Sequence, residues 1–227
     1  MSETQKETTQ QPAATPDLLR RCVTEFMGTF VLVFTVCCAG LADVELGALA
    51  IGASLMVVVF AGGHISGAHY NPAVSLAVML RGRLDPSDLV PYWVSQLLGG
   101  ALAAGVAQFV IDPPAQHPKA FHGHHLGSAF VAEFVFTLIL AYVVLNVATS
   151  ASHPANSFYG LAIGFTVFAG AAAVGPISGG VFNPAVGFGV SLVKLSAWSN
   201  IWIYVVACLA AGAAAAYLFK FLNPNDA

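Results

Sequence analysis

The sequence predicts an all-α membrane protein with six transmembrane helices and two re-entrant half-helices, arranged as an inverted internal repeat. Only 8% of its 227 residues are charged and 57% are hydrophobic, whereas a soluble domain has about 25% charged residues. Several apolar runs reach or approach the ~20 residues that span a bilayer. The tetrapeptide Asn-Pro-Ala-Val also occurs twice, at 71–74 and 183–186, which are 112 positions apart (183 minus 71).

Residues 1–18 are rich in Ser, Thr, Gln, Glu, Pro and Ala, a composition that predicts a disordered cytoplasmic tail. The rest of the chain, 19–222, is expected to form one membrane domain of two repeats, about 19–111 and 126–222. Its six apolar runs are 22–41, 47–62, 89–111, 126–149, 157–174 and 197–222. Since each repeat has an odd number of spans, the repeats have opposite orientations, and such folds place their sites at the repeat interface near the midplane.

Each Asn-Pro-Ala motif has the residues of a helix start. Asn is a favourable N-cap, and Pro is well suited to the first helical position. The pattern predicts short helices over 71–81 and 183–194, each ~17 Å long at 1.5 Å per residue, about half of a ~30 Å bilayer core. Two such helices meeting start-to-start would bring their positive dipole ends together. Each asparagine would cap its own helix and offer an amide N–H to a lumen that repels cations, including hydronium.

Two carboxylates, Glu25 and Glu133, lie deep in the first and fourth apolar runs, 108 positions apart (133 minus 25). Intramembrane carboxylates are costly and usually functional. We expect them to accept hydrogen bonds from the motif loops, whose backbone groups need partners at membrane depth; a proton-carrying site is the alternative. Further residues repeat at an offset of 112, pairing Tyr92, Gln96 and Gly100 with Tyr204, Cys208 and Gly212.

The distribution of basic residues predicts a multi-pass integral membrane protein with both termini in the cytoplasm. Arginines precede the first run and follow the first motif, whereas the loop after the first run has Asp43 and Glu45 and no Lys or Arg. Lys119 and Lys194 are isolated and are given no role. The four cysteines are interpreted as packing residues.

These residues together resemble the aquaporin, or major intrinsic protein, family. The resemblance covers about 19–222 and rests on Glu25-Phe26-Met27-Gly28-Thr29-Phe30, the segment from Gly63 to Val74, Gln96, Glu133-Phe134 and Asn183-Pro184-Ala185. It implies a single channel domain, a homotetramer and one pore per subunit. By analogy, the pore motifs are Asn71, Pro72, Ala73, Asn183, Pro184 and Ala185. The lumen carbonyls would come from Gly67, Ala68, His69, Gly179, Gly180 and Val181.

The sequence departs from that family at the constriction that sets selectivity. Family members usually have Arg directly after the second Asn-Pro-Ala, where this chain has Val186. By their spacing from the two motifs, the other constriction positions correspond to Ile51, Ala171 and Gly180. We call these four residues the selectivity ring. The ring has no charge and no side-chain donor. Because Ala171 and Gly180 are very small, the opening is expected to be wide and no longer to reject solutes by size. The apolar ring offers little to replace hydration, so ions still bear the cost of dehydration.

The sequence therefore predicts a passive channel for water and small uncharged solutes, with ammonia, hydrogen peroxide, urea and glycerol as candidates. An apolar ring that dewets and conducts water slowly stays open as an alternative. Gly187 stands where glycerol facilitators typically have Asp, which argues against a dedicated glycerol channel. The apolar ring is similar to those of broad-range branches, some of them vacuolar, so a vacuolar membrane is an alternative to a plasma or inner membrane.

Four of the seven histidines lie in the loop between the two repeats. The simplest interpretation is a polar extracellular loop, and a metal site or pH sensor is the alternative. In the resembled family this loop dips towards the outer pore mouth, so His122 or His124 could supply a donor that the ring lacks.

Other classes of function fit the sequence less well. An ion-coupled secondary transporter also uses inverted repeats, but only Glu25 and Glu133 could form its coupling site. A non-conducting structural membrane protein is a second alternative. No nucleophile–base pair, metal-ligand spacing or phosphate loop indicates an enzyme, a cofactor or a metal. The expected partners are the lipid bilayer, water, small neutral solutes and further copies of the chain, with no nucleic acid.

Overall fold

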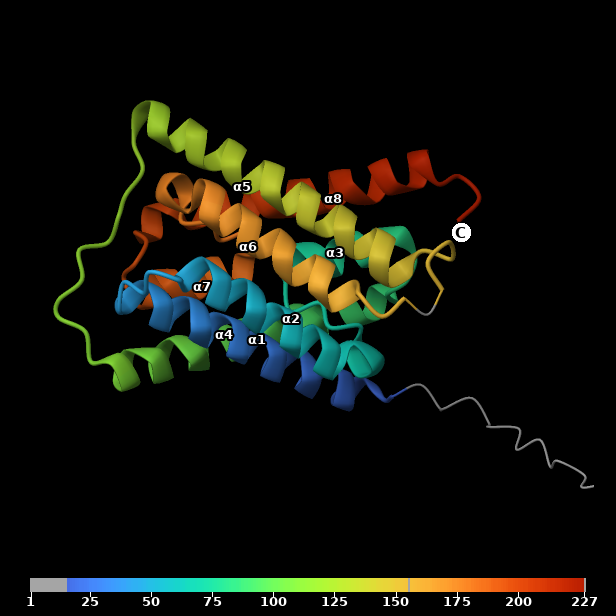
Figure 1. The fold of residues 1–227 in the computed structure, drawn as a ribbon, viewed down its shortest axis with the longest axis horizontal. Helices are drawn as coiled ribbons and strands as arrows, with labels where there is room; N and C mark the ends of the chain where they lie inside the picture. The colour runs from blue at the N-terminus through green and yellow to red at the C-terminus, as the bar shows by residue number, and fades with distance from the viewer. Residues whose placement is uncertain (1–15, 155, 227) are drawn as a thin grey trace, which may run out of the picture.

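The computed structural model describes residues 16–154 and 156–226, and these residues fold mainly into helices (Figure 1). In chain order they are α1 (Leu18–Leu41), α2 (Gly47–Ser66), α3 (Pro72–Arg81), α4 (Pro86–Ile111), α5 (Gly123–Val144), the π-helix η1 (Leu145–Thr149), α6 (Tyr159–Ser178), α7 (Pro184–Leu192), the 3₁₀-helix η2 (Trp198–Asn200) and α8 (Ile201–Leu222). Within this described part of the chain, six helical segments are long and apolar enough to cross a membrane. The short helices α3 and α7 follow the two Asn-Pro motifs, as predicted.

Several helix boundaries differ from those expected from the apolar runs. Helix α1 begins at Leu18, because the Asp17 carboxylate caps it by accepting the Arg20 N–H at 2.8 Å; residues 1–15 of the predicted tail lie outside the described residues. Helices α2 and α6 each continue four residues past the predicted ends at 62 and 174, to Ser66 and Ser178. Helix α7 ends at Leu192, two residues before the predicted 194.

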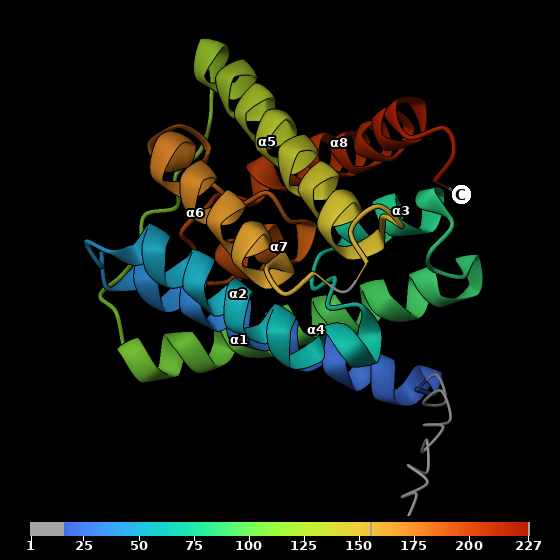
Figure 2. The same cartoon turned by 45° about the vertical axis from the view of Figure 1, so that its right-hand side comes forward.

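The long helices form two groups of three that correspond to the two repeats. Helices α1, α2 and α4 lie along one side of the bundle and α5, α6 and α8 along the other (Figures 1 and 2). The groups meet where α2 crosses α6 at Gly52 and Gly164. A Cβ atom at Gly52 would lie 2.7 Å from the Gly164 carbonyl oxygen, and one at Gly164 would lie 2.5 Å from the Gly52 oxygen. Such close backbone approach is typical of small residues between membrane helices.

Each half-helix begins against a long helix of the opposite repeat. A Cβ atom at Gly100 of α4 would lie 3.1 Å from the carbonyl oxygen of Ala185, at the start of α7. A Cβ atom at Gly212 of α8 would collide with the carbonyl of Ala73, at the start of α3. These matched contacts position both helix starts in the interior of the bundle.

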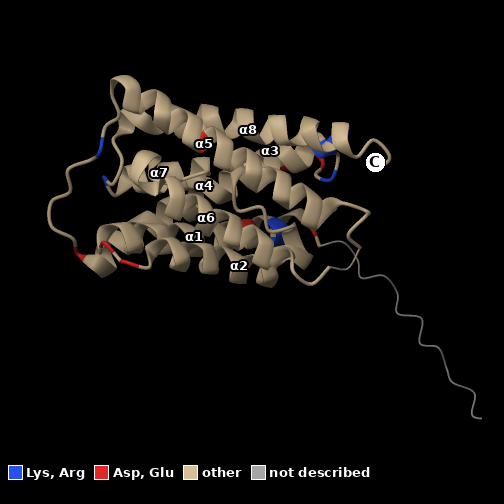
Figure 3. Cartoon of the chain, turned by 45° about the horizontal axis from the view of Figure 1, so that its top comes forward, with Lys and Arg blue, Asp and Glu red and all other residues tan. Residues whose placement is uncertain are grey.

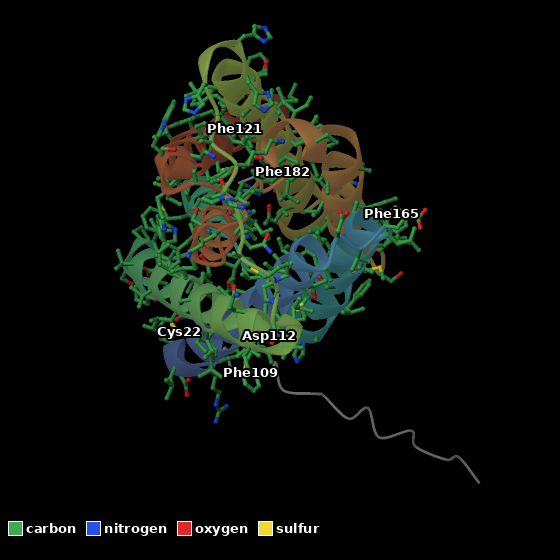
Figure 4. All side chains as sticks on the ribbon, turned by 90° about the vertical axis from the view of Figure 1, so that its left-hand side faces the viewer. Cys22, Phe109, Asp112, Phe121, Phe165 and Phe182 are labelled. Carbon is green, nitrogen blue, oxygen red and sulfur yellow. The ribbon has the colours of Figure 1, made fainter. Side chains whose placement is uncertain are left out.

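Both ends of the described chain lie at one end of the bundle, which we call the terminal end; we call the other the loop end (Figure 1). Charged residues gather at these two ends, and the middle of the bundle is nearly free of them (Figure 3). The flanks expose large apolar side chains such as Phe109, which is 86% exposed and points outward, whereas Phe182 is buried (Figure 4). A flank of this kind fits a hydrocarbon environment.

Candidate functional site

The two half-helices are capped in the same way. The Asn71 Oδ1 atom accepts the Ala73 N–H at 2.9 Å, and the Asn183 Oδ1 atom accepts the Ala185 N–H at 2.9 Å. Both asparagines have extended backbone, with φ of −157° and −159°, and a proline follows each at the first helical position. This geometry is that of side-chain N-caps, and it directs the start of each helix towards the same interior space.

The two asparagine amides also join the repeats crosswise. Asn71 donates from Nδ2 to the Phe182 carbonyl at 2.9 Å, and Asn183 donates from Nδ2 to the Tyr70 carbonyl at 2.8 Å. The sequence did not predict these bonds, which use one of the two N–H groups on each amide. Both asparagines line one cavity, so a second N–H remains on each for a molecule in that cavity.

Glu25 and Glu133 hold the segments that lead into the half-helices. Both are fully buried. Glu25 accepts the His69 N–H at 2.9 Å and the Tyr70 N–H at 2.7 Å. Glu133 accepts the equivalent N–H groups of Val181 at 3.0 Å and Phe182 at 2.6 Å. Each carboxylate thereby supplies partners to irregular backbone that has no water to bind.

These bonds fix a strained backbone. Tyr70 has φ of 50° and Phe182 has φ of 51°, in the left-handed region that side chains other than glycine rarely adopt. Gly67 and Gly179, at φ of 86° and 97°, adopt left-handed values without that cost. The left-handed residues turn the backbone of each segment, so that some of its N–H groups reach the carboxylate while other backbone groups border the cavity.

The structure also reveals supporting residues to which the sequence analysis gave no role. Ser66 and Ser178 donate their hydroxyls to Glu25 and Glu133 at 2.7 and 2.6 Å. Tyr92 and Tyr204 donate theirs to the carbonyls of Ser66 and Ser178 at 2.8 and 3.0 Å. The offset of 112 relates the members of each pair, and it was the signal that could have found the serines. The matched Gln96 and Cys208 differ: Gln96 donates to Glu25 at 2.8 Å, whereas the Cys208 sulfur lies 3.9 Å from Glu133.

A narrow cavity of about 20 Å³ lies between the two asparagines. One part of its wall comes from the segments before the half-helices, through Ala68, His69, Gly180 and Val181. The rest of the wall is largely aliphatic and includes Leu32, Leu55, Leu140, Val144, Ile163 and Val167. Of the six predicted carbonyl residues, Gly67 lines instead the larger vestibule described next, and Gly179 borders neither space.

A wider vestibule of about 740 Å³ opens from the cavity towards the terminal end. His69, Val144 and Ile163 line both spaces. The His69 ring is buried beside Tyr92, with ring centroids 5.2 Å apart, and its Nδ1 lies 3.1 Å from the Ser75 hydroxyl. Among the described residues, the vestibule wall includes Arg21, Arg83, His64 and His153 and no carboxylate. Arg21 forms an ion pair with Asp88 at 2.7 Å. A passage thus leads from the asparagines to a mouth lined by basic side chains.

Three of the four residues predicted for the selectivity ring, Ile51, Gly180 and Val186, line the cavity. Ala171 does not line it but packs behind Gly180, where a Cβ atom would lie 3.0 Å from the Ala171 Cα. None of the four carries a polar side chain. The structure thus brings the predicted residues together, with Ala171 setting how closely α6 approaches Gly180.

The two histidines predicted as donors at the outer pore mouth are not among the residues that line the central cavity. His124 lines a separate surface groove between α5 and α6 with apolar residues such as Val131 and Val135. His122 is exposed and directly precedes α5. A role for either of them at the outer mouth stays a prediction.

Known proteins match the chain over nearly its whole length. The sequence profile of the family described as major intrinsic protein matches residues 12–219. Probable aquaporin TIP-type alpha from Phaseolus vulgaris is 36% identical over 226 residues, covering 92% of this chain and 87% of that protein. Aquaporin NIP1-2 from Arabidopsis thaliana is 31% identical over 224 residues, covering 92% of this chain and 76% of that protein.

The fold is also similar to that of a solved structure. The X-ray structure of the aquaglyceroporin from Plasmodium falciparum superposes with a TM-score of 0.78 at 21% identity, covering 92% of this chain and 98% of that one. The six long apolar helices identify a multi-pass integral membrane protein. With the family profile spanning both motifs and both repeats, the chain belongs to the major intrinsic protein family.

Proposed function

We propose that this chain is a passive channel for water and for small uncharged solutes, a class that includes ammonia, hydrogen peroxide, urea and glycerol. The observation that carries the proposal is the cavity between Asn71 and Asn183, whose wall, among the residues that the structure describes, has no Asp, Glu, Lys or Arg. The relatives of this chain are channels and not enzymes, and a passive pore needs no cofactor. The similarity to an aquaporin and to an aquaglyceroporin supports the same class of solute.

The chemistry of the cavity supports selection by polarity. Two amide N–H groups and the N-termini of α3 and α7 offer donors to a solute oxygen. The backbone of the segments before the half-helices offers acceptors, and the aliphatic rest of the wall offers nothing to an ion. A neutral solute can exchange its hydration for these groups. A cation would meet acceptors from only part of the wall, because the rest is aliphatic, and it would also be repelled by the positive helix starts.

The ring of Ile51, Ala171, Gly180 and Val186 supports a broad solute range. It contains no fixed charge, and two of its members are the smallest residues. We infer that the ring limits size weakly and that exclusion of protons and cations depends on the positive helix starts at the asparagines. Glu25 and Glu133 act as braces, because each of them already accepts two backbone N–H groups and a serine hydroxyl.

The distribution of basic residues and the apolar flanks support the orientation and the assembly that we propose. The terminal end faces the cytoplasm in this proposal, since Arg21, Arg83 and the Arg81–Asp226 pair lie there and basic residues favour the cytoplasmic side. The homotetramer is supported by the apolar flanks of each subunit, and the membrane is a plasma or inner membrane, with a vacuolar membrane as the alternative.

Stopped-flow measurements on proteoliposomes test the proposal. Vesicles containing the protein should shrink faster than protein-free vesicles in impermeant osmolyte, and should then reswell in urea and glycerol without any ion gradient. Flux that saturates and requires a sodium or proton gradient would instead identify a coupled transporter. Equal rates with and without protein would identify a non-conducting protein. The variant Gly180→Leu, which adds bulk between Ala171 and the cavity, is the blocked control.

A further inference from the structure

The loop between the two repeats brings one cation to the loop end of the passage. Residues 112–122 cross that end from α4 to α5 (Figures 1 and 4). The Lys119 Nζ atom donates to the Pro176 carbonyl at 3.0 Å. Pro176 lies in the last turn of α6, whose carbonyls have no further helical N–H groups to accept. A cation is favoured at such a C-terminus by the helix dipole.

The internal repeat shows where this helix end lies relative to the passage. His64, Ser66 and Gly67 line the vestibule at the terminal end. The residues 112 positions later are Pro176, Ser178 and Gly179. Because the two repeats are inverted, these residues occupy the equivalent place at the loop end, where the passage opens to the other side of the membrane.

The end of α6 that contains Pro176 also borders the selectivity ring. A Cβ atom at Gly180 would lie 3.4 Å from the Cα of Gly175 and 3.0 Å from that of Ala171. Pro176 directly follows Gly175 in the chain, so Lys119 binds the turn of α6 that packs behind Gly180. Among the described residues Lys119 makes no ion pair, and its charge is therefore not neutralised locally.

A buried polar network holds this part of the loop in place. The Lys119 carbonyl accepts the Asn200 Nδ2–H at 2.7 Å and the Ala197 N–H at 3.0 Å. The Asn200 side chain is buried and also donates to the Ser196 hydroxyl at 3.0 Å. Ser196 lies 3.0 Å from the Tyr204 hydroxyl, which donates to the Ser178 carbonyl at 3.0 Å. The network joins the loop to α6 just before the backbone that borders the cavity.

From these contacts we propose that Lys119 is a selectivity-determining residue, and that its ammonium supplies at the loop-end mouth the positive charge absent from the apolar ring. The role rests on the proposed channel function. The charge repels monovalent cations before they reach the ring and leaves neutral solutes unaffected. Because Lys119 is exposed to water, its field is screened by salt, and its effect is strongest at low ionic strength.

Cation currents in planar bilayers test the role of Lys119. At about 10 mM salt, Lys119→Gln should raise the potassium current about two- to tenfold, the range for one charge acting over roughly 10 Å near a protein surface. Lys119→Glu should raise it further, and Lys119→Arg should match the native channel. At about 1 M salt, where the screening length is ~3 Å, the native and Gln currents should agree within twofold.

Lys194→Gln is the matched control, because Lys194 is also exposed in a loop near the end of α7 and makes no contact with Pro176. Unchanged potassium currents in the Gln and Glu variants would overturn the inference, as would an equal rise in Lys194→Gln. Loss of urea and water flux in Lys119→Gln would also overturn it, since the residue would then only clip the loop to α6. If the native protein conducts neither urea nor water in the proteoliposome assay, the proposed function itself fails, whatever the potassium currents of the variants.

Discussion

The carboxylate of Glu133 holds Phe182 in a left-handed backbone conformation by accepting its N–H at 2.6 Å. The carbonyl of the same residue accepts the Asn71 amide from the opposite repeat at 2.9 Å. One peptide segment therefore connects a buried acid, a strained turn and the cap of the other half-helix. This segment therefore links the residue that braces the backbone to the wall of the cavity.

Replacing Glu133 by Gln should destabilise the protein. Gln has one acceptor oxygen and a donor NH₂ group, so one of the N–H groups of Val181 and Phe182 loses its partner. A hydrogen bond to a charged group contributes about 1.5–3 kcal/mol, and we expect a loss of about 3 kcal/mol with a lower yield of folded protein. Thermal unfolding in detergent measures the loss. Glu45→Gln, in the exposed loop after α1, should unfold like the native protein; equal stability of both variants would contradict the brace.

Replacing Asn183 by Asp should change ion exclusion more than folding. Asp retains the oxygen that caps α7 but lacks the Nδ2 donor to Tyr70, and it places a carboxylate at the cavity wall. We expect a monovalent cation current at least tenfold above that of the native channel, since a negative charge would offset the positive helix starts. Patch or planar-bilayer recording measures the current. Asn183→Ser, a neutral cap, should keep cations out, and a leak of the same size there would refute the electrostatic explanation.

Replacing Val186 by Arg should narrow the solute range. The longer side chain adds bulk, a fixed charge and several donors to the ring. Urea and glycerol fluxes should fall at least tenfold, while water flux falls less. Stopped-flow reswelling with each solute gives the comparison, and Val186→Met separates added bulk from added charge. Glycerol flux that persists in the Arg variant would mean that Val186 does not border the narrowest part of the passage.

A pH-dependent contact lies at the terminal end of the bundle, beyond the predicted domain end at 222. The pKa of Asp226 is lowered, first by the hydrogen bond from the Ser150 hydroxyl and further by the Ala151 N–H and by Arg81 and Arg83. A carboxylate with a lowered folded pKa stabilises the fold above its unfolded pKa, and that stabilisation is lost as the pH falls through the folded pKa. The contact should therefore weaken below the ordinary Asp value of about 3.9.

Hydrogen exchange of the segment 150–154 reports this contact. At neutral pH, Asp226→Asn should exchange faster there than the native protein. The Asp226 carboxylate accepts the Ser150 hydroxyl at 2.6 Å and the Ala151 N–H at 3.1 Å, and a neutral amide oxygen accepts such bonds less strongly. On acidification the native protein should approach the Asn variant, and the variant itself should show no further step. Asp112→Asn, at the opposite end of the bundle, serves as the charge control. An identical pH profile in the native protein and the Asp226→Asn variant would exclude Asp226 as the titrating group.

The fold was predictable from sequence where the physical signal is local. Asn followed by Pro defines a helix start, and a buried Glu between apolar residues indicates backbone groups in need of acceptors, so α3, α7 and both acids were predicted. The ends of α2 and α6 were not, because the last turn of each contains polar residues or Pro that interrupt the apolar pattern. Polar composition does not reveal that these turns remain helical.

Long-range contacts explain the rest of what the sequence did not show. Lys119 is isolated in the sequence, and nothing near it indicates a bond to a carbonyl 57 residues away. The histidines were conspicuous by their number, but the structure places His124 in an apolar surface groove, and none of the four loop histidines lines the central cavity. The crossed bonds of Asn71 and Asn183 likewise require both repeats to be folded and in contact.

Gly100 and Gly212 show that each half-helix begins against the other half of the molecule. Neither repeat by itself therefore provides the complete packing surface for its own half-helix. A single half could therefore border a continuous passage only by pairing with a second copy inserted in the opposite direction. The covalent link between the two repeats keeps such a pair together in one chain.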